Sequence, residues 1–274
     1  MTSLRAIGDA DWPDIVARTT AKATPDADHT VRVSPTGLAA GTVYYYRFEA
    51  QGTTTRVGRT KTAPARDADV GVKFAFCSCQ DYIGRYWHSW QALLDEKAPL
   101  DFILYLGDYI YDSVDPQERV RVPASGEIED LTDVPSHRRR HALYLSDPDL
   151  RAARAAHPWF LLWDNHDIAR GRPAYGGGVQ AFREWNPLPA PSPALPLDQI
   201  YRVLRYGDLA DLYAVDMFLF EGRDALPGDA GASVLGTAQF DWLSASLRES
   251  RARWRLLGMQ KVFTEFGPFS GWQD

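Results

Sequence analysis

The chain has 274 residues, of which 45% are hydrophobic and 12% aromatic, and its formal net charge is −6 at pH 7. The apolar content suffices for a folded core and excludes an intrinsically disordered chain. The acidic balance argues against binding to duplex nucleic acid, which needs a cationic face. No apolar run approaches the roughly 18 to 20 residues of a membrane-spanning helix, and no basic segment followed by an apolar stretch marks a signal peptide.

Residues 1–64 are predicted to form a small β domain. Apolar and polar residues alternate over 29–34, turn residues follow, and 43–49 is rich in aromatic residues. These features predict two strands that pair antiparallel through the connection at 35–42. Short strands of this kind are typical of a fibronectin type III sandwich, which has about seven strands. Fewer are recognisable here, so we expect an incomplete, fibronectin III-like domain that does not add strands to the following sheet.

Residues 65–274 show the pattern of an α/β domain. A buried-type strand, a helix and a second buried-type strand follow one another, which is the signature of a parallel sheet. Further helices and strands alternate toward the C-terminus. The expected strands lie at 72–79, 101–106, 158–163 and 254–262, and the expected helices at 86–97, 147–156 and 240–251.

Three of these strands end in side chains that can bind metal ions. Cys79 ends the first strand, Asp108 and Tyr111 follow the second, and Asn165 and His166 follow the third. In open parallel sheets, ligands bind beyond the carboxyl ends of the strands, so these side chains should converge there. Each residue taken alone has a structural alternative. A polar residue after a strand can form a turn, Asp108 can cap a helix, Tyr111 can belong to the core and His166 can be structural.

The chemistry of this set favours a pair of metal ions. Asp108 offers two oxygens that can bridge two cations, and Gly107 before it allows a sharp turn. A Tyr111 phenolate and a Cys79 thiolate suit oxidised iron better than calcium or magnesium. Asn165 offers a neutral oxygen to the second metal. In a binuclear phosphoesterase, His166 can contact a phosphoryl oxygen or protonate the leaving group.

In their order along the chain these motifs resemble those of PhoD-type alkaline phosphatases. Gly107-Asp-Tyr-Ile-Tyr111 is the most specific of them. The segments that carry the resemblance are Cys79-Gln80, 107–111, 163–167, 201–216, 235–243 and 254–260, together with 29–64 for the N-terminal β domain.

The resemblance implies a metallophosphoesterase-like domain of the calcineurin-like superfamily, in which sheets and helices form layers. It also implies hydrolysis of small phosphate monoesters or diesters by an Fe³⁺–Ca²⁺ centre, in the periplasm or outside the cell. By position, Cys79 and Tyr111 would hold the iron, Asp108 would bridge, Asn165 would hold calcium and His166 would be catalytic. It leaves the oligomeric state and the preferred ester undefined.

The chain departs from the family pattern at several positions. Asn165 and Asp167 stand where many relatives have Asp and Glu, Phe218 stands where the family has Arg, and Met259 stands where Asn is common. The family's last motif, a Gly-Asp-x-His-like stretch that supplies metal ligands, has no counterpart before Asp274. We therefore expect a chain that lacks the C-terminal ligands, with little phosphatase activity in residues 1–274. The alternative is a degenerate homologue that acts as a binding module without catalysis.

Three other features give predictions outside these motifs. Arg138–Arg140 with His141 is interpreted as a solvated helix face, with contact to an anionic substrate as the alternative. Gly176–Gly178 lacks the Lys-Ser/Thr of a phosphate-binding loop and is interpreted as a flexible loop near the site. Cys77 and Cys79, two residues apart on a strand, have poor geometry for a disulfide.

Overall fold

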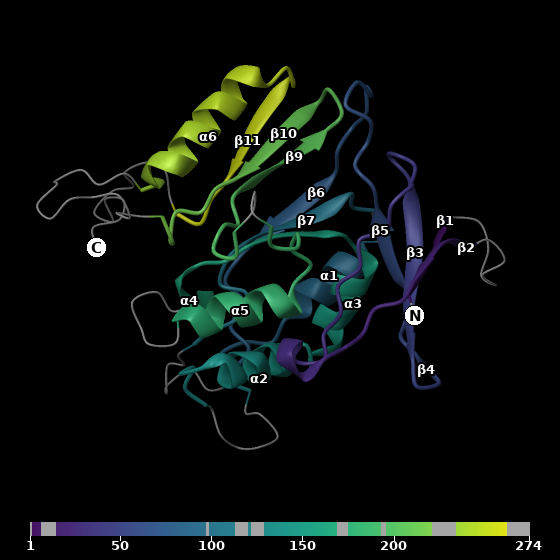
Figure 1. Cartoon of the computed structure of the whole chain (residues 1–274), viewed down its shortest axis with the longest axis vertical. Helices are drawn as coiled ribbons and strands as arrows, with labels where there is room; N and C mark the ends of the chain where they lie inside the picture. The colour runs from purple at the N-terminus through teal and green to yellow at the C-terminus, as the bar shows by residue number, and fades with distance from the viewer. Residues whose placement is uncertain are drawn as a thin grey trace, which may run out of the picture.

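The computed structural model describes residues 2–6, 15–96, 99–112, 120–121, 129–168, 175–192, 196–220 and 234–261. Figure 1 shows a small β sheet at the N-terminal side and a larger arrangement of sheets and helices beside it. The described strands of the N-terminal sheet pair only with one another, so this sheet is separate from the two later ones.

The N-terminal sheet is centred on β3. Its strands are β1 (Thr2–Ala6), β2 (Ile15–Thr19), β3 (Val43–Ala50), β4 (Thr53–Thr54) and β5 (Gly58–Lys61). The prediction of a strand at 29–34 is wrong, because this segment follows a short 3₁₀ helix, Pro25–Ala27, and forms no strand. β3 instead pairs antiparallel with β1 on one edge and β5 on the other, which leaves no edge for 29–34.

Among the described residues of 1–64 the strands form one sheet, with β1 and β2 lying upstream of the strands that sequence indicated. The two facing sheets of a fibronectin III-like sandwich therefore stay a prediction. The division of the chain at residue 64 likewise stays a prediction.

The rest of the described chain contains two three-stranded sheets. β6 (Phe74–Cys77), β7 (Phe102–Leu106) and β8 (Trp159–Leu162) form the first, and all its pairs are parallel. β9 (Arg202–Tyr206), β10 (Ala210–Ala214) and β11 (Trp254–Gly258) form the second, in which β10 and β11 are parallel and β9 is antiparallel. Helix α1 (His88–Asp95) connects β6 to β7, which confirms the predicted β-α-β unit.

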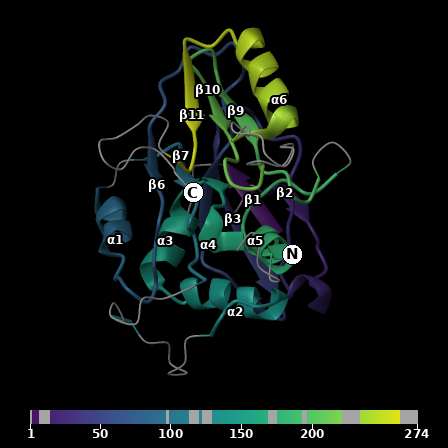
Figure 2. The same ribbon diagram turned by 90° about the vertical axis from the view of Figure 1, so that its left-hand side faces the viewer.

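Sheets and helices form four layers (Figures 1 and 2). An apolar cluster that includes Phe102, Leu104, Tyr206 and Leu212 joins the faces of the two sheets. Helices α1, α2 (Val134–Tyr144), α3 (Pro148–Ala156), α4 (Asn165–Ile168) and α5 (Tyr175–Trp185) lie on the other side of the first sheet, and α6 (Gly236–Glu249) covers the second. The predicted α/β architecture of layered sheets and helices is confirmed.

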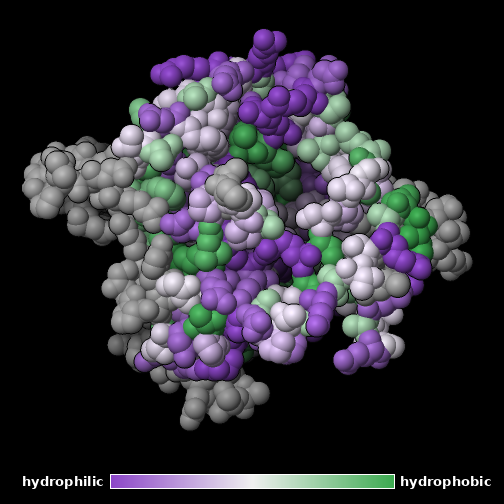
Figure 3. Space-filling view, in the orientation of Figure 1, coloured by the Kyte–Doolittle hydropathy of each residue, from purple (hydrophilic) through white to green (hydrophobic). Residues whose placement is uncertain are grey.

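The view in Figure 3 shows largely hydrophilic side chains over one face of the molecule, with hydrophobic side chains gathered around a central hollow. In the described part of the chain, no helix has the length and apolar character needed to cross a membrane.

The interpretation of Gly176–Gly178 as a flexible loop is wrong, because these residues belong to α5. A Cβ atom at Gly177 would lie 2.8 Å from the backbone nitrogen of Val134, and one at Gly178 would lie 2.6 Å from Cα of Ile168. The glycines thus allow α5 to approach α2 and α4 more closely than any side chain would permit.

The interpretation of Arg138–His141 as a solvated helix face holds for only part of it. Arg139 is exposed and pairs with Glu129. Arg140 and His141 are buried, and Arg138 forms an ion pair with Glu184 of α5. Consecutive cationic residues need not form a solvated surface when partners pair with them. Here Glu184 pairs with Arg138, and the carbonyls of Tyr111 and Glu129 accept from Arg140.

His141 is expected to destabilise the fold at acid pH. Its ring lies between those of Tyr109 and Trp185, with centroids 6.0 and 6.3 Å away, and neither ring nitrogen has a hydrogen-bond partner in the described structure. Burial, and then the charges of His137, Arg154 and Arg140, hold the pKa of His141 well below its ordinary value.

Below a pH of about 6.5 the unfolded chain therefore takes up a proton at this position that the folded chain refuses. The free energy of unfolding should fall by about 1.4 kcal/mol per pH unit for that proton. His141→Phe keeps an aromatic ring and removes the proton, so its urea midpoint should fall less than that of the wild type between pH 7 and pH 5. Parallel losses in the two proteins would contradict this account.

Candidate functional site

The candidate site lies at the carboxyl edge of the β6–β7–β8 sheet. Cys79 follows β6, Asp108 and Tyr111 follow β7, and Asn165 and His166 begin helix α4 directly after β8. Because the three strands run parallel, their carboxyl ends meet at the same edge of the sheet.

Main-chain hydrogen bonds tie the segments after β6 and β7 together. The backbone N–H of Cys79 donates to the carbonyl of Gly107 at 3.2 Å, and that of Gln80 donates to the carbonyl of Asp108 at 3.1 Å. The Gln80 amide nitrogen also donates to the carbonyl of Tyr109 at 3.0 Å. The two segments therefore form a single platform beyond the sheet.

Asp167 ties the segment after β8 to the same platform. Its fully buried carboxylate accepts from the backbone N–H of Ile110 at 2.9 Å and of Asp164 at 2.8 Å. Asp167 thus bridges two loops through their backbones.

Two proposed ligands adopt an uncommon backbone conformation. Cys79 has φ 61° and Asp108 has φ 55°, both in the left-handed region that non-glycine residues rarely occupy. Such conformations cost on the order of 1–3 kcal/mol each and cluster at functional sites. Here the strained residues stand at adjacent strand ends, which favours a functional role for this edge.

Gly107→Ala is expected to destabilise the protein and displace this edge. Gly107 has φ 107°, and a Cβ atom there would lie 2.7 Å from Cβ of Asp164, so the substitution forces the loops after β7 and β8 apart. Gly52→Ala is the matched control, since Gly52 also has positive φ but no atom lies within 4 Å of its added Cβ. Gly52→Ala should cost only the left-handed penalty of about 1–2 kcal/mol, and Gly107→Ala clearly more. Equal shifts in thermal unfolding would contradict the close approach.

The structure brings four of the five predicted site residues into contact. The Cys79 thiol lies 3.6 Å from a carboxylate oxygen of Asp108, and the Tyr111 phenol lies near enough to interact with both groups. The His166 ring stacks on that of Tyr111 with centroids 4.3 Å apart, and its backbone N–H donates to Asp108 at 3.4 Å. Asn165 lies next to His166, and its side chain makes no hydrogen bond to this cluster in the described structure.

Burial favours the protonated form of each of the three acidic groups of the cluster. Burial raises the pKa of Asp108, of Cys79 and of Tyr111. The Asp108 charge raises the pKa of Cys79 and Tyr111 further. A carboxylate, a thiolate and a phenolate can share this space only if a cation balances them. The donor set therefore fits a metal ion, and an oxidised iron in particular.

In the described residues, no group of three or more side chains drawn from histidine, cysteine, aspartate and glutamate is arranged to hold a metal ion. Of these types the cluster contributes Cys79 and Asp108. The third donor of the cluster is the Tyr111 phenol, so the candidate centre depends on a tyrosine in addition to these four residue types.

Two acidic residues near the cluster were not predicted as site residues. Asp112 accepts from, or donates to, Nδ1 of His166 at 2.6 Å, and it directly follows Tyr111 in the sequence. Asp164 precedes Asn165, and burial, followed by the charge of Asp108, raises its pKa to about 7. The sequence signal that could have identified both residues is their position next to Tyr111 and Asn165 at the ends of the strands.

The pKa of His166 results from opposing effects. Burial lowers it, but the Asp112 hydrogen bond and the charge of Asp108 outweigh that effect and raise the pKa overall. The side chain of His166 is 27% exposed, whereas that of Asp112 is 3% exposed. Asp112 is therefore placed to orient the imidazole from the protein side, with the ring reaching toward solvent.

The second sheet braces the end of β8. The Trp163 indole donates to the buried carboxylate of Asp216 at 2.7 Å. The Gln260 amide donates to the carbonyl of Trp163 at 2.8 Å and accepts from the backbone N–H of Met217 at 3.1 Å. Asp216 and Gln260 thus hold the segment that precedes Asn165.

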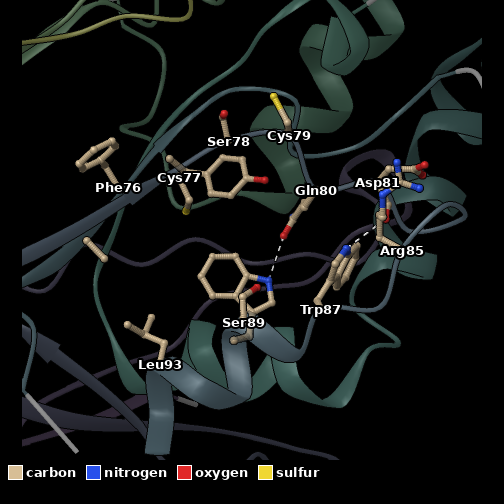
Figure 4. Close-up of a pocket in the computed structure, with 13 residues that line it drawn as sticks. Phe76, Cys77, Ser78, Cys79, Gln80, Asp81, Arg85, Trp87, Ser89 and Leu93 are labelled. Atoms are coloured by element: carbon tan, nitrogen blue, oxygen red, sulfur yellow. Dashed lines mark hydrogen bonds between the residues drawn. The ribbon is translucent and has the colours of Figure 1, made fainter. Parts of the chain in front are cut away.

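A cavity of about 280 Å³ lies beside the cluster, between β6 and α1. In Figure 4 the Gln80 side chain points into this region, where its amide oxygen accepts from the Trp90 indole at 3.2 Å. The Cys79 sulfur points away from it. Cys79 itself belongs to the lining of the cavity, so the cavity adjoins the cluster at this residue. Cys77 and Cys79 are both free thiols, as predicted.

The fold and site define an α/β protein whose candidate metal-binding side chains lie beyond the ends of parallel strands. The family model for the PhoD-like phosphatase matches residues 74–170 and 173–273, and that for its N-terminal domain matches 2–64. The chain belongs to the PhoD-like phosphatase family.

Two known proteins show the extent of the similarity. Alkaline phosphatase D of Bacillus subtilis (strain 168) is 36% identical over 94% of this chain and 49% of its own length. The solved structure of PhoD superposes with a TM-score of 0.83 at 32% identity, covering 98% of this chain and 57% of that one. The chain thus spans about half the length of the curated relative it matches.

Proposed function

We propose that the protein is a metal-dependent phosphatase that hydrolyses phosphate monoesters or diesters at a binuclear Fe³⁺–Ca²⁺ centre. The observation that carries the proposal is the cluster of Cys79, Asp108 and Tyr111 at two adjacent strand ends. A thiol, a carboxyl and a phenol in a partly buried place, where the charge of the carboxyl raises the pKa of the other two, contribute little to the stability of the fold by themselves.

The chain's own residues divide the work between them. Cys79 and Tyr111 would hold iron, Asp108 would bridge to calcium, and Asn165 would offer its amide oxygen to the calcium ion. Two metal ions held in this way would polarise the phosphoryl group and lower the pKa of a water molecule. The strained backbone at Cys79 and Asp108 fixes the directions of two of these side chains in advance.

His166 is proposed as the catalytic residue. Its Nδ1 is engaged by Asp112, so Nε2 is the ring atom that can reach a phosphoryl oxygen or give a proton to the leaving group. Asp112 holds the ring in one orientation, and stacking on Tyr111 keeps it beside the proposed iron ligand.

Small phosphate esters are the proposed substrates, and the family resemblance supports action in the periplasm or outside the cell. The direct test is turnover of p-nitrophenyl phosphate and of its bis-ester by the full-length protein loaded with Fe³⁺ and Ca²⁺. The proposal expects turnover that disappears on removal of the metals and returns when they are restored. Metal binding without turnover of either ester would instead support the binding module.

A further inference from the structure

Helix α2 carries two buried polar side chains that contact the main chain of a proposed ligand. Arg140 and Tyr144 are four residues apart, so they lie on the same face of the helix. The Tyr144 hydroxyl accepts from the backbone N–H of Tyr111 at 3.0 Å. The Arg140 guanidinium donates to the carbonyl of the same residue. Both polar groups of the Tyr111 main chain are thus bound by one helix.

The Tyr144 hydroxyl also reaches the segment that follows β6. It accepts from the backbone N–H of Tyr82 at 3.1 Å, three residues beyond Cys79. One hydroxyl therefore joins the segments that carry the proposed ligands Cys79 and Tyr111. Its ring is fully buried and packs on the rings of Tyr82 and Trp87, with centroids 5.6 and 5.2 Å away.

Helix α2 is itself held in place at its start. Asp133 and Ser136 form a reciprocal capping box, in which the Ser136 N–H donates to the Asp133 carboxylate at 2.8 Å and the Asp133 N–H donates to the Ser136 hydroxyl at 3.0 Å. Arg138 fixes the same helix to α5 through Glu184. The helix can therefore act as a rigid support.

We propose that α2 is a positioning element of the site, in which Tyr144 and Arg140 hold the Tyr111 backbone so that its phenol meets Cys79 and Asp108. This proposal rests on the proposed function, since it assigns a support to one of the metal ligands. Burying an arginine and a tyrosine hydroxyl costs free energy unless they are paired. Here the pairing is directed at backbone groups of Tyr111, Tyr82 and Glu129 rather than at other side chains of the helix, and Tyr111 is the residue that both side chains bind.

The test uses Tyr144→Phe, which keeps the ring and removes the acceptor from two backbone N–H groups. Iron retained by the full-length protein is measured by equilibrium dialysis against a competing chelator. The expected result is a 10- to 100-fold weaker iron affinity, the usual effect of losing a partner that orients a ligand. Tyr213→Phe is the matched control, because Tyr213 is also fully buried and its hydroxyl donates to the Ser246 carbonyl at 3.0 Å, toward α6. It should retain wild-type iron affinity.

A double mutant separates positioning from a general loss of structure. If Tyr144 acts through Tyr111, its substitution should have little further effect in a Tyr111→Phe background, whereas independent effects would multiply. Arg140→Gln, which removes the donor on the other side of Tyr111, should reproduce the loss if Tyr144→Phe fails to fold. If the wild-type protein retained no iron, both the proposed function and the positioning role of α2 would be overturned. If the wild type retained iron and Tyr144→Phe and Tyr213→Phe bound it with equal affinity, only the positioning role of α2 would be overturned.

Discussion

Tyr111→Phe and Cys79→Ser are each expected to weaken or abolish the visible absorption of the iron-loaded protein. Phenolate and thiolate ligands give ferric iron its charge-transfer bands, and neither a phenyl ring nor a hydroxyl replaces them. Both residues contact Asp108 and each other, so loss of either also removes a donor from the cluster. The measurement is the visible spectrum at matched iron content.

Two conservative substitutions serve as controls for this prediction. Cys77→Ser changes a thiol that lies two residues away and packs against the apolar core instead of the cluster. Tyr213→Phe removes a buried phenol on the second sheet. Both should leave the spectrum as it is in the wild type. Unchanged absorption in Tyr111→Phe and Cys79→Ser as well would count against the iron site.

Asp108→Asn is expected to reduce turnover of p-nitrophenyl phosphate by more than about 100-fold, because loss of an outer partner alone costs up to that factor. An amide conserves the size of the side chain but cannot supply two anionic oxygens to two cations. Asp108 also accepts the His166 backbone N–H, so the change reaches the proposed catalytic residue.

Asp211→Asn is the matched control for this carboxylate. Asp211 is also buried, and it binds Arg205 of the same sheet at 3.0 Å and the hydroxyl of Ser250, the residue that caps the C-terminal end of α6, at 2.7 Å. Its substitution breaks a buried ion pair and should lower thermal stability, while turnover per folded molecule stays near that of the wild type. Similar activities for the two variants would contradict the bridging role of Asp108.

The parallel sheet and the gathering of polar side chains at one of its edges could be predicted from the sequence, because each strand is short, continuous and apolar, and ends at polar residues. Cys79, Asp108 and His166 follow such runs directly, so the topology alone brings them together. The prediction of a strand at 29–34 failed because the alternation of apolar and polar residues identifies a candidate strand but not a partner for it. In the structure, β1 and β5 already occupy both edges of β3.

Features that depend on tertiary partners could not be predicted. Arg140 and His141 have the composition of a solvated surface, yet they are buried because Tyr111 offers a carbonyl and Tyr109 and Trp185 offer ring faces. Asp112 has no motif of its own, and its role rests on a contact with His166, which lies 54 residues away in the chain. Such pairings exist only once β7 and β8 lie side by side.

Anomalous diffraction at the iron absorption edge, from crystals of the full-length protein loaded with ferric iron, tests the central claim most directly. The account predicts one strong iron peak within about 2.0 to 2.5 Å of the Cys79 sulfur, a carboxylate oxygen of Asp108 and the phenol oxygen of Tyr111, as expected for bonds from metals to sulfur and oxygen. Iron bound elsewhere in the protein, with no peak between these three side chains, would contradict it.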